Sequence, residues 1–277
     1  MRVPSDAEIE RRAGLMARIH PSAVVEKGAQ LDEDVEVGPF TLIGAEVQIG
    51  GGTHVGPNVV ISGRTRIGRG NRIYSFTSLG EIPQDKKYAG EPTELVIGDG
   101  NMIREFCSFN AGTVQGGGTT RIGSDNWIMA YVHLAHDCVI GDHTILANAT
   151  QLAGHVVVGD WAIIGGMTGA HQFVRIGAHA MCGGGSTLLQ DVPPYILCRG
   201  NPCQPFGINV EGLQRRGFDE VAVAALKRAY RSIFREGLTL AQARDAILAE
   251  AQSNPAASET LAPLAEFLAT PGRGIIR

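Results

Sequence analysis

An aliphatic residue recurs at every sixth position of this chain, and this period constrains the fold more than any other feature. From Ile19 to Leu79, 11 consecutive positions six residues apart hold Ile, Val or Leu. The period resumes at Ile97, shifts by one residue, and then runs from Ile122 to Leu188. A period of six matches neither a helix, at 3.6 residues per turn, nor the alternation of an isolated strand. It is typical of hexapeptide β-helices, in which turns join short strands.

The residues around the repeat predict how the coils close. Glycine accounts for 37 of the 277 residues and often follows the aliphatic position, as at Gly38 and Gly50. We expect these glycines to adopt turn conformations that other residues avoid. If three hexads form one triangular coil, residues 18 apart lie one above another, with coils about 4.8 Å apart. The sequence therefore predicts a mainly β protein built as a parallel β-helix.

Two segments interrupt the period, and a third region departs from it. Residues 80–95 (GEIPQDKKYAGEPTEL) and 111–120 (AGTVQGGGTT) read as loops, where function tends to concentrate on a solenoid. After Leu188 the period stops, and helical spacing begins near Phe218, with Asp219 and Thr239 as expected N-caps and a third helix at 258–269. We therefore expect an N-terminal extension (1–18), a β-helix (19–195), and a linker with a C-terminal α-helical domain (196–277).

Composition excludes several classes of protein. The formal net charge of -4 argues against a nucleic-acid partner. No apolar run approaches the roughly 20 residues of a transmembrane segment, and the N-terminus lacks the apolar core of a secretory signal. The 5 cysteines are odd in number and show no C-x-x-C spacing, which indicates a reduced, cytoplasmic protein.

Six of the eight histidines fall between residues 133 and 179. The 18-residue repeat gathers polar positions on one outer face: His133, His136, Asp137, Gly154, His155 and Gln172. An imidazole at His136 could act as a general base, with Asp137 fixing its tautomer. The Gly154 backbone N–H could stabilise an oxyanion. No Ser, Thr or Cys stands in the same columns, so the set suits direct transfer better than a covalent nucleophile.

Other interpretations of these residues stay open. The histidines could be solvated, could pack in a trimer, or could hold zinc. Gln84, Asp85 and Lys87 could contact a sugar or phosphate, and Arg215 with Arg216 could pair with a diphosphate. Both clusters could also be ordinary charged loops.

Several stretches together resemble the UDP-N-acetylglucosamine O-acyltransferase family of lipid A biosynthesis. They are QDKKYAGEPT (84–93), GTVQGGG (112–118), HLAHDC (133–138), LAGH (152–155), IIGGMTGAHQF (163–173), QDVPPY (190–195) and GINVEGLQRRGF (207–218). The resemblance implies a left-handed parallel β-helix and a homotrimer with active sites between subunits. It also implies transfer of a 3-hydroxyacyl chain from acyl carrier protein to the sugar 3-hydroxyl of UDP-N-acetylglucosamine.

The resemblance implies residue roles as well. His136 is expected as the general base, Asp137 as its orienting partner and Gly154 as the oxyanion donor. Contacts to the sugar and acyl groups are expected from Gln84, Asp85, Lys87, His133, His155 and Gln172, and contacts toward the nucleotide from Asn209, Glu211, Arg215 and Arg216. Gly184 falls where the family sets acyl length, and a glycine there predicts room for a longer chain. No metal and no cofactor are expected, because the phosphopantetheine arm arrives on the carrier protein.

One departure and three alternatives remain at this level. Asn110-Ala111 stands where family members often carry His-Arg, which concerns a substrate contact but not the base. The same fold could use a 3-amino sugar as acceptor. It could use another acyl donor such as acetyl-CoA. A zinc-dependent hydratase on a β-helix is the alternative from a different class.

Overall fold

The computed structural model describes residues 17–270 and 272–277, which form two compact units, one ending at Cys138 and the other beginning at Val139. Residues 1–16, most of the predicted N-terminal extension, lie outside the described part. The first strand begins at Arg18. Among the described residues no helix is both long and apolar enough to cross a membrane.

The first unit is a parallel β-helix whose successive strands pass in turn to three sheets. One sheet holds β1 (Arg18–Ile19), β4 (Glu36–Val37), β7 (His54–Val55), β10 (Arg72–Ile73), β13 (Met102–Ile103) and β16 (Trp127–Ile128). The second holds β2 (Val24–Val25), β5 (Leu42–Ile43), β8 (Val60–Ile61), β11 (Ser78–Glu81), β14 (Ser108–Asn110) and β17 (His133–Leu134). The third holds β3 (Gln30–Leu31), β6 (Gln48–Ile49), β9 (Arg64–Ile67), β12 (Glu94–Ile97) and β15 (Thr119–Ile122).

The second unit repeats this arrangement and then changes to helices. One sheet holds β18 (Val139–Ile140), β21 (Val157–Val158) and β24 (Arg175–Ile176). The second holds β20 (Gln151–Leu152), β23 (Gly169–Ala170) and β26 (Thr187–Leu188). The third holds β19 (Ile145–Leu146), β22 (Ile163–Ile164), β25 (Met181–Cys182), β27 (Ile196–Arg199) and β28 (Gln204–Ile208). β27 pairs in parallel with β25, so strand pairing continues past residue 195, where we expected the β-helix to end. β28 then returns antiparallel to β27.

The six-residue period marks the core, as predicted. Val37, Ile43, Ile61 and Leu79 are fully buried or nearly so. The small residue two positions before the aliphatic one has its own function. Thr41 is buried, donates its hydroxyl to the Gly56 carbonyl at 2.7 Å and accepts the Val59 N–H at 3.2 Å. Buried polar atoms between coils are thereby satisfied.

The glycines that follow the aliphatic positions have a different role from the predicted one. Left-handed backbone occurs instead at other corner residues, such as Phe40 (φ 59°) and Phe76 (φ 60°). Gly38 and Gly50 are absent from that region. A Cβ added at Gly50 would lie 2.7 Å from the Gly68 carbonyl carbon, and one at Gly38 would lie 2.8 Å from that of Gly56. The turn expectation is therefore wrong at these positions, where glycine is needed because neighbouring coils approach closely.

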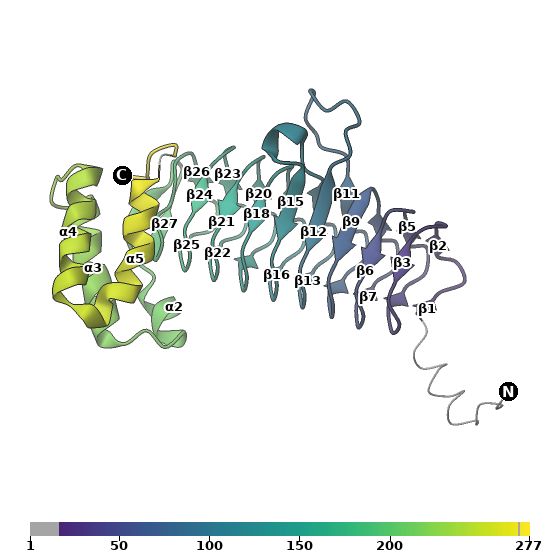
Figure 1. Cartoon of the computed structure of the whole chain (residues 1–277), viewed down its shortest axis with the longest axis horizontal. Coiled ribbons are helices and arrows are strands. Elements are labelled where there is room, and N and C mark those ends of the chain that lie inside the picture. Colours follow the sequence, from purple (N-terminus) through teal and green to yellow (C-terminus); the bar gives the residue numbers. More distant parts are fainter. Residues whose placement is uncertain (1–16, 271) are drawn as a thin grey trace. The chain divides into compact units, whose positions relative to one another are not determined.

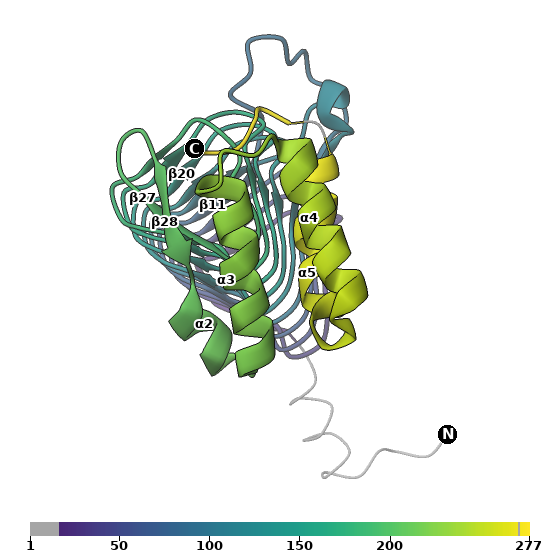
Figure 2. The same cartoon turned by 90° about the vertical axis from the view of Figure 1, so that its left-hand side faces the viewer.

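The two interruptions change the offset between neighbouring coils of the first unit. Paired residues lie 18 apart in the first coils, 30 apart across the first interruption and 25 apart across the second. The inserted chain is shorter than predicted: 82–93 between β11 and β12, and 111–118 between β14 and β15, with a 3-10 turn, η1 (Val114–Gly116). Both insertions rise side by side from one edge of this unit (Figures 1 and 2). The Asn110 side chain ties their bases together through a 3.0 Å bond to the Ile82 carbonyl.

The described residues of the second unit end in four helices: α2 (Val210–Arg215), α3 (Glu220–Phe234), α4 (Leu240–Ser253) and α5 (Pro255–Ala269). Asp219 caps α3 and Thr239 caps α4, as predicted, the latter in a capping box with Gln242. α5 starts at Pro255, before the expected residue 258, because proline is favoured at the first position of a helix. The long helices α3, α4 and α5 pack side by side (Figure 2) around a core that includes Leu226 and Leu261.

Candidate active site

His136 and Asp137 form a hydrogen-bonded pair immediately after β17. The His136 Nδ1 lies 2.8 Å from the Asp137 Oδ2. The Asp137 side chain is 1% exposed and that of His136 is 13% exposed. A carboxylate can only accept, so Nδ1 carries the proton and Nε2 holds the basic lone pair. The pair predicted from adjacent sequence positions therefore has the geometry of an oriented general base.

The second insertion covers the Asp137 carboxylate. The Thr113 N–H donates to Oδ1 at 2.8 Å, and the Thr113 hydroxyl donates to Oδ2 at 2.6 Å. The Asp137 N–H in turn donates to the Thr120 hydroxyl at 2.8 Å. Sequence reasoning missed both threonines. A signal for Thr113 was present, because threonine three residues before the glycine run is a typical capping residue.

Gly116 is needed in this cover because its backbone approaches Asp137 closely. A Cβ at Gly116 would lie 2.0 Å from the Asp137 Cγ. We expect Gly116→Ala to lower the free energy of unfolding by about 1–3 kcal/mol, since overpacking displaces buried groups. Gly169→Ala is the control, because a Cβ there meets nothing within 4 Å. Urea denaturation of both variants tests this expectation, and equal stabilities would contradict it.

His133 lies on β17 beside Ser108 on β14. The Ser108 hydroxyl is 2.8 Å from the His133 Nδ1, and the two residues are paired in register. Burial lowers the pKa of His133, which keeps the ring neutral at neutral pH. A neutral, fixed imidazole suits hydrogen bonding to an uncharged ligand group.

The first insertion presents the predicted residues Gln84, Asp85 and Lys87. Gln84 and Lys87 are exposed, whereas Asp85 is half-buried. The Asp85 carboxylate accepts the Lys87 N–H at 2.9 Å, and its carbonyl accepts the Tyr88 N–H at 3.0 Å. Asp85 therefore shapes the turn of this loop, on which Gln84 and Lys87 are exposed.

In the second unit, Gly154 and His155 follow β20. The Gly154 carbonyl accepts the Phe173 N–H at 3.1 Å, and the His155 ring stacks on Phe173 at 4.3 Å. These contacts confirm the 18-residue alignment of this stretch with Gln172 and Phe173. Across residues 17–270 and 272–277, the buried Gly154 N–H donates no hydrogen bond to protein. The alignment of His136 with Gly154 rests on the repeat and stays a prediction.

The residues predicted to lie toward the nucleotide are on and beside α2. Glu211 and Arg215 are exposed and form an ion pair at 3.3 Å. Asn209 is buried and caps α2, with its Oδ1 accepting the Gly212 N–H at 3.2 Å. The sequence therefore placed four residues together, but one of them has a clear structural function as a cap.

Arg216, the fourth of these residues, lies against a stack of rings. Its guanidinium carbon is 5.1 Å from the centre of the Trp161 ring, and its Nη1 is 3.4 Å from the His179 Nδ1. His179 is stacked between Trp161 and Tyr195. Sequence reasoning named neither Trp161 nor His179 as partners of this arginine.

The protonation of His179 should make stability depend on pH. Burial, followed by repulsion from Arg216, lowers the pKa of His179 to about 4, although Asp160 opposes the shift. The unfolded chain binds this proton near pH 6.5. The contribution of His179 to the free energy of unfolding should therefore be fully present above pH 6.5 and be lost as the pH drops toward 4. Over this pH range, we expect the free energy of unfolding of His179→Phe to fall by about 1 kcal/mol less than that of wild type, a value that allows for the partial exposure of His179. Urea denaturation at each pH measures both proteins. Identical pH dependence in both proteins would contradict this.

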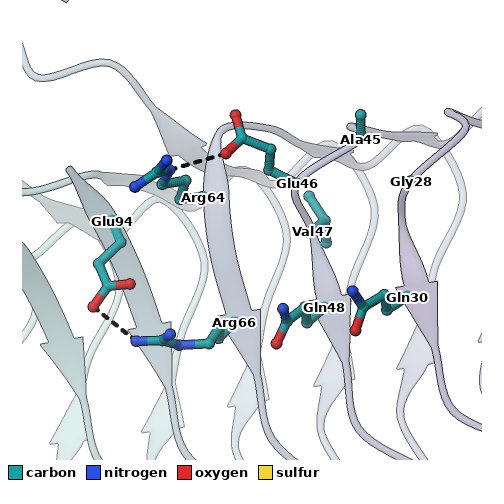
Figure 3. Close-up of a pocket in the computed structure, with 9 residues that line it drawn as sticks. All are labelled: Gly28, Gln30, Ala45, Glu46, Val47, Gln48, Arg64, Arg66 and Glu94. Carbon is teal, nitrogen blue, oxygen red and sulfur yellow. Dashed lines mark hydrogen bonds and ion pairs between the residues drawn. The ribbon is translucent and has the colours of Figure 1, made fainter. Parts of the chain in front are cut away.

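A polar hollow of about 380 Å³ lies in the early coils of the first unit (Figure 3). Its two guanidinium groups are already paired, Arg64 with Glu46 at 2.9 Å and Arg66 with Glu94 at 2.8 Å. No histidine, cysteine, serine or threonine lines it. Its two carboxylates, Glu46 and Glu94, are each held in an ion pair with an arginine, and no histidine stands beside them as at His136.

Comparisons with known proteins point to one family. Residues 191–276 match the family model described as Udp N-acetylglucosamine O-acyltransferase, domain 2, and residues 119–151 match the bacterial transferase hexapeptide model. The chain is 57% identical over 262 residues to an acyl-[acyl-carrier-protein]--UDP-N-acetylglucosamine O-acyltransferase of Thiobacillus denitrificans, with 95% of this chain and 100% of that protein covered. A protein of the same name from Albidiferax ferrireducens is 54% identical over 264 residues, with the same coverage.

Solved structures agree with the sequence relatives. LpxA from Acinetobacter baumannii aligns with a TM-score of 0.89 at 46% identity, covering 94% of this chain and 99% of that chain. LpxA from Moraxella catarrhalis aligns with a TM-score of 0.90 at 43% identity, covering the same shares.

Proposed function

Because the chain belongs to the UDP-N-acetylglucosamine O-acyltransferase family, we propose that it transfers a 3-hydroxyacyl chain from acyl carrier protein to the 3-hydroxyl of UDP-N-acetylglucosamine. This reaction is the first step of lipid A biosynthesis. The observation that carries the proposal is the hydrogen-bonded His136–Asp137 pair, in which the buried Asp137 carboxylate accepts from Nδ1 of His136.

The His136 Nε2 removes the proton of the sugar 3-hydroxyl as that oxygen attacks the thioester carbonyl carbon. A C–O bond forms, and the carbonyl oxygen becomes an oxyanion that the Gly154 N–H stabilises. The oxyanion collapses, the C–S bond breaks, and the sulfur takes the proton from His136, so that phosphopantetheine leaves as the thiol. The protein itself forms no covalent intermediate.

The remaining predicted residues bind the two substrates. Gln84, Asp85, Lys87, His133, His155 and Gln172 contact the sugar and acyl groups, and Asn209, Glu211, Arg215 and Arg216 contact the nucleotide. The neutral His133 ring and the exposed Lys87 support this division. The reaction needs no metal and no organic cofactor beyond the arm of the carrier protein. Among the described residues the five cysteines form no disulfide, which supports a location in the cytoplasm.

The active assembly is a homotrimer. Apolar side chains on the outer surface of the first unit support this state, because Val24, Leu42 and Val60 stand in register on neighbouring strands and are partly or largely exposed. Such a stripe is typical of surfaces that bury against another chain. Light scattering after gel filtration should give three times the chain mass of 29.3 kDa. A mass of one chain would contradict a trimer.

A competition experiment tests the reaction. The protein is given UDP-N-acetylglucosamine, its 3-amino analogue and 3-hydroxyacyl carrier proteins of several lengths, and products are identified by mass spectrometry. The proposal predicts acylation of the hydroxyl sugar as an ester. Exclusive acylation of the amine would instead favour the 3-amino acceptor. No product with either, together with stoichiometric zinc in the protein, would favour a hydratase.

Gly184 sets the length of the acyl chain. It is exposed, and a Cβ there would meet only the Gly166 backbone, at 3.2 Å from its carbonyl oxygen. A larger side chain therefore needs a small shift of the Gly166 backbone and would stand at an exposed position. We expect Gly184→Met to shift the preferred donor to chains shorter by several carbons, measured as kcat/KM for each donor. An unchanged length profile would remove Gly184 from this role.

A further inference from the structure

The Asp137 carboxylate is buried almost completely, and a buried carboxylate is stable only when donors replace its lost water. The second insertion supplies those donors through one residue. Thr113 contributes both its N–H and its hydroxyl. We propose that Thr113 is a positioning residue for the transfer reaction, which holds Asp137 so that Asp137 can orient His136. This role rests on the proposed function.

Thr113 holds both oxygens of the carboxylate. Its N–H donates to Oδ1 at 2.8 Å, and its hydroxyl donates to Oδ2 at 2.6 Å. Oδ2 is also the oxygen that accepts from the His136 Nδ1, at 2.8 Å. Since the hydroxyl fixes where Oδ2 lies, it also fixes the direction in which the His136 ring is held.

The direction of the Thr113 hydroxyl is itself determined. Its oxygen accepts the Gly116 N–H at 3.2 Å, so its single proton is directed to Asp137. The Thr113 carbonyl accepts the Gly118 N–H at 2.8 Å, which closes the turn around it. Thr113 is only 1% exposed. The turn of the second insertion therefore fixes the Thr113 hydroxyl, which donates to Asp137 and is shielded from solvent.

Loss of this hydroxyl should affect turnover more than substrate binding. The Thr113 side chain is buried and cannot contact a bound substrate, so KM should change little. The imidazole would be held less well in the transition state, and kcat should fall. Hydrogen-bond partners that orient metal-bound histidines typically contribute about 10- to 100-fold, and we expect an effect of this order on kcat here.

The test compares Thr113→Val, which removes the hydroxyl at constant shape, with Thr113→Ser, which keeps it. Thr119→Val is the matched control, because the Thr119 hydroxyl donates to Glu94 at 3.2 Å. We expect kcat to fall about tenfold in Thr113→Val, with KM for both substrates within twofold. We expect Thr113→Ser and Thr119→Val to stay near wild type. An unchanged kcat in Thr113→Val, a loss confined to KM, or a failure of serine to restore kcat would overturn the role.

Thr113→Cys covers the case in which valine prevents folding. A thiol is a weaker donor than a hydroxyl, so its kcat should lie clearly below that of Thr113→Ser. Equal kcat values for Cys and Ser would overturn the role. A wild-type protein without turnover would overturn the proposed function itself, whereas an active wild type with a fully active Thr113→Val variant would overturn only the role of Thr113.

Discussion

Replacement of His136 by alanine is expected to lower kcat by about 10²- to 10⁴-fold, the usual contribution of a general base. The ring is oriented by a 2.8 Å bond to Asp137, and its removal leaves the sugar hydroxyl without a proton acceptor. The substrate-binding residues are untouched, so KM for UDP-N-acetylglucosamine should change much less than kcat. Steady-state kinetics with acyl carrier protein thioesters give both values.

His54→Ala is the matched control for this variant. His54 is an exposed histidine on β7, 3.9 Å from Glu36, in coils that carry none of the proposed catalytic groups. Its activity should equal that of wild type. Circular dichroism should show both variants to be folded. A folded His136→Ala variant with activity within a few-fold of wild type would refute the assignment of the base.

Replacement of Asp191 by alanine is expected to lower the free energy of unfolding by about 3–5 kcal/mol, because it leaves its arginine partner without a counter-ion. The Asp191 side chain is fully buried, and it accepts from the Arg175 Nε at 2.9 Å. Arg175 also donates to the Thr270 carbonyl at 3.1 Å and lies over the Phe267 ring. The pair thus links β24 to the end of α5 within the second unit.

The control for Asp191 is an exposed ion pair in the same unit. Glu211→Ala breaks the Glu211–Arg215 pair and should cost no more than about 0.5 kcal/mol, because solvent screens exposed charges. Urea denaturation measures both variants. A loss below 1 kcal/mol for Asp191→Ala would show that the buried pair does not stabilise this region.

The period of six predicted most of the fold because it reports burial directly. From Val37 to Leu79 every sixth side chain is buried in the core, and the same spacing sets the 18-residue register. It could not reveal why glycine follows the aliphatic position, since a sequence pattern does not separate a special φ from a close approach of backbones. The sequence analysis also missed β27, because it pairs with β25 at an offset that differs from the regular 18 residues. α2 is too short to show helical periodicity.

The candidate site was predictable where its residues are adjacent in sequence or separated by whole coils. His136 and Asp137 are adjacent, and His155 stacks on Phe173 at the expected spacing. Thr113 lies 24 residues before Asp137, across an insertion that changes the offset between coils. The length of an insertion and the path of its backbone determine that contact, and the repeat contains no information about either.

The most direct test of the account is the mass of the product formed from UDP-N-acetylglucosamine and a 3-hydroxyacyl carrier protein, with wild type and His136→Ala measured side by side. The account predicts one ester-linked acyl-nucleotide sugar with wild type and little or none with the variant in the same time. No such product from wild type, or equal amounts from both proteins, would contradict it.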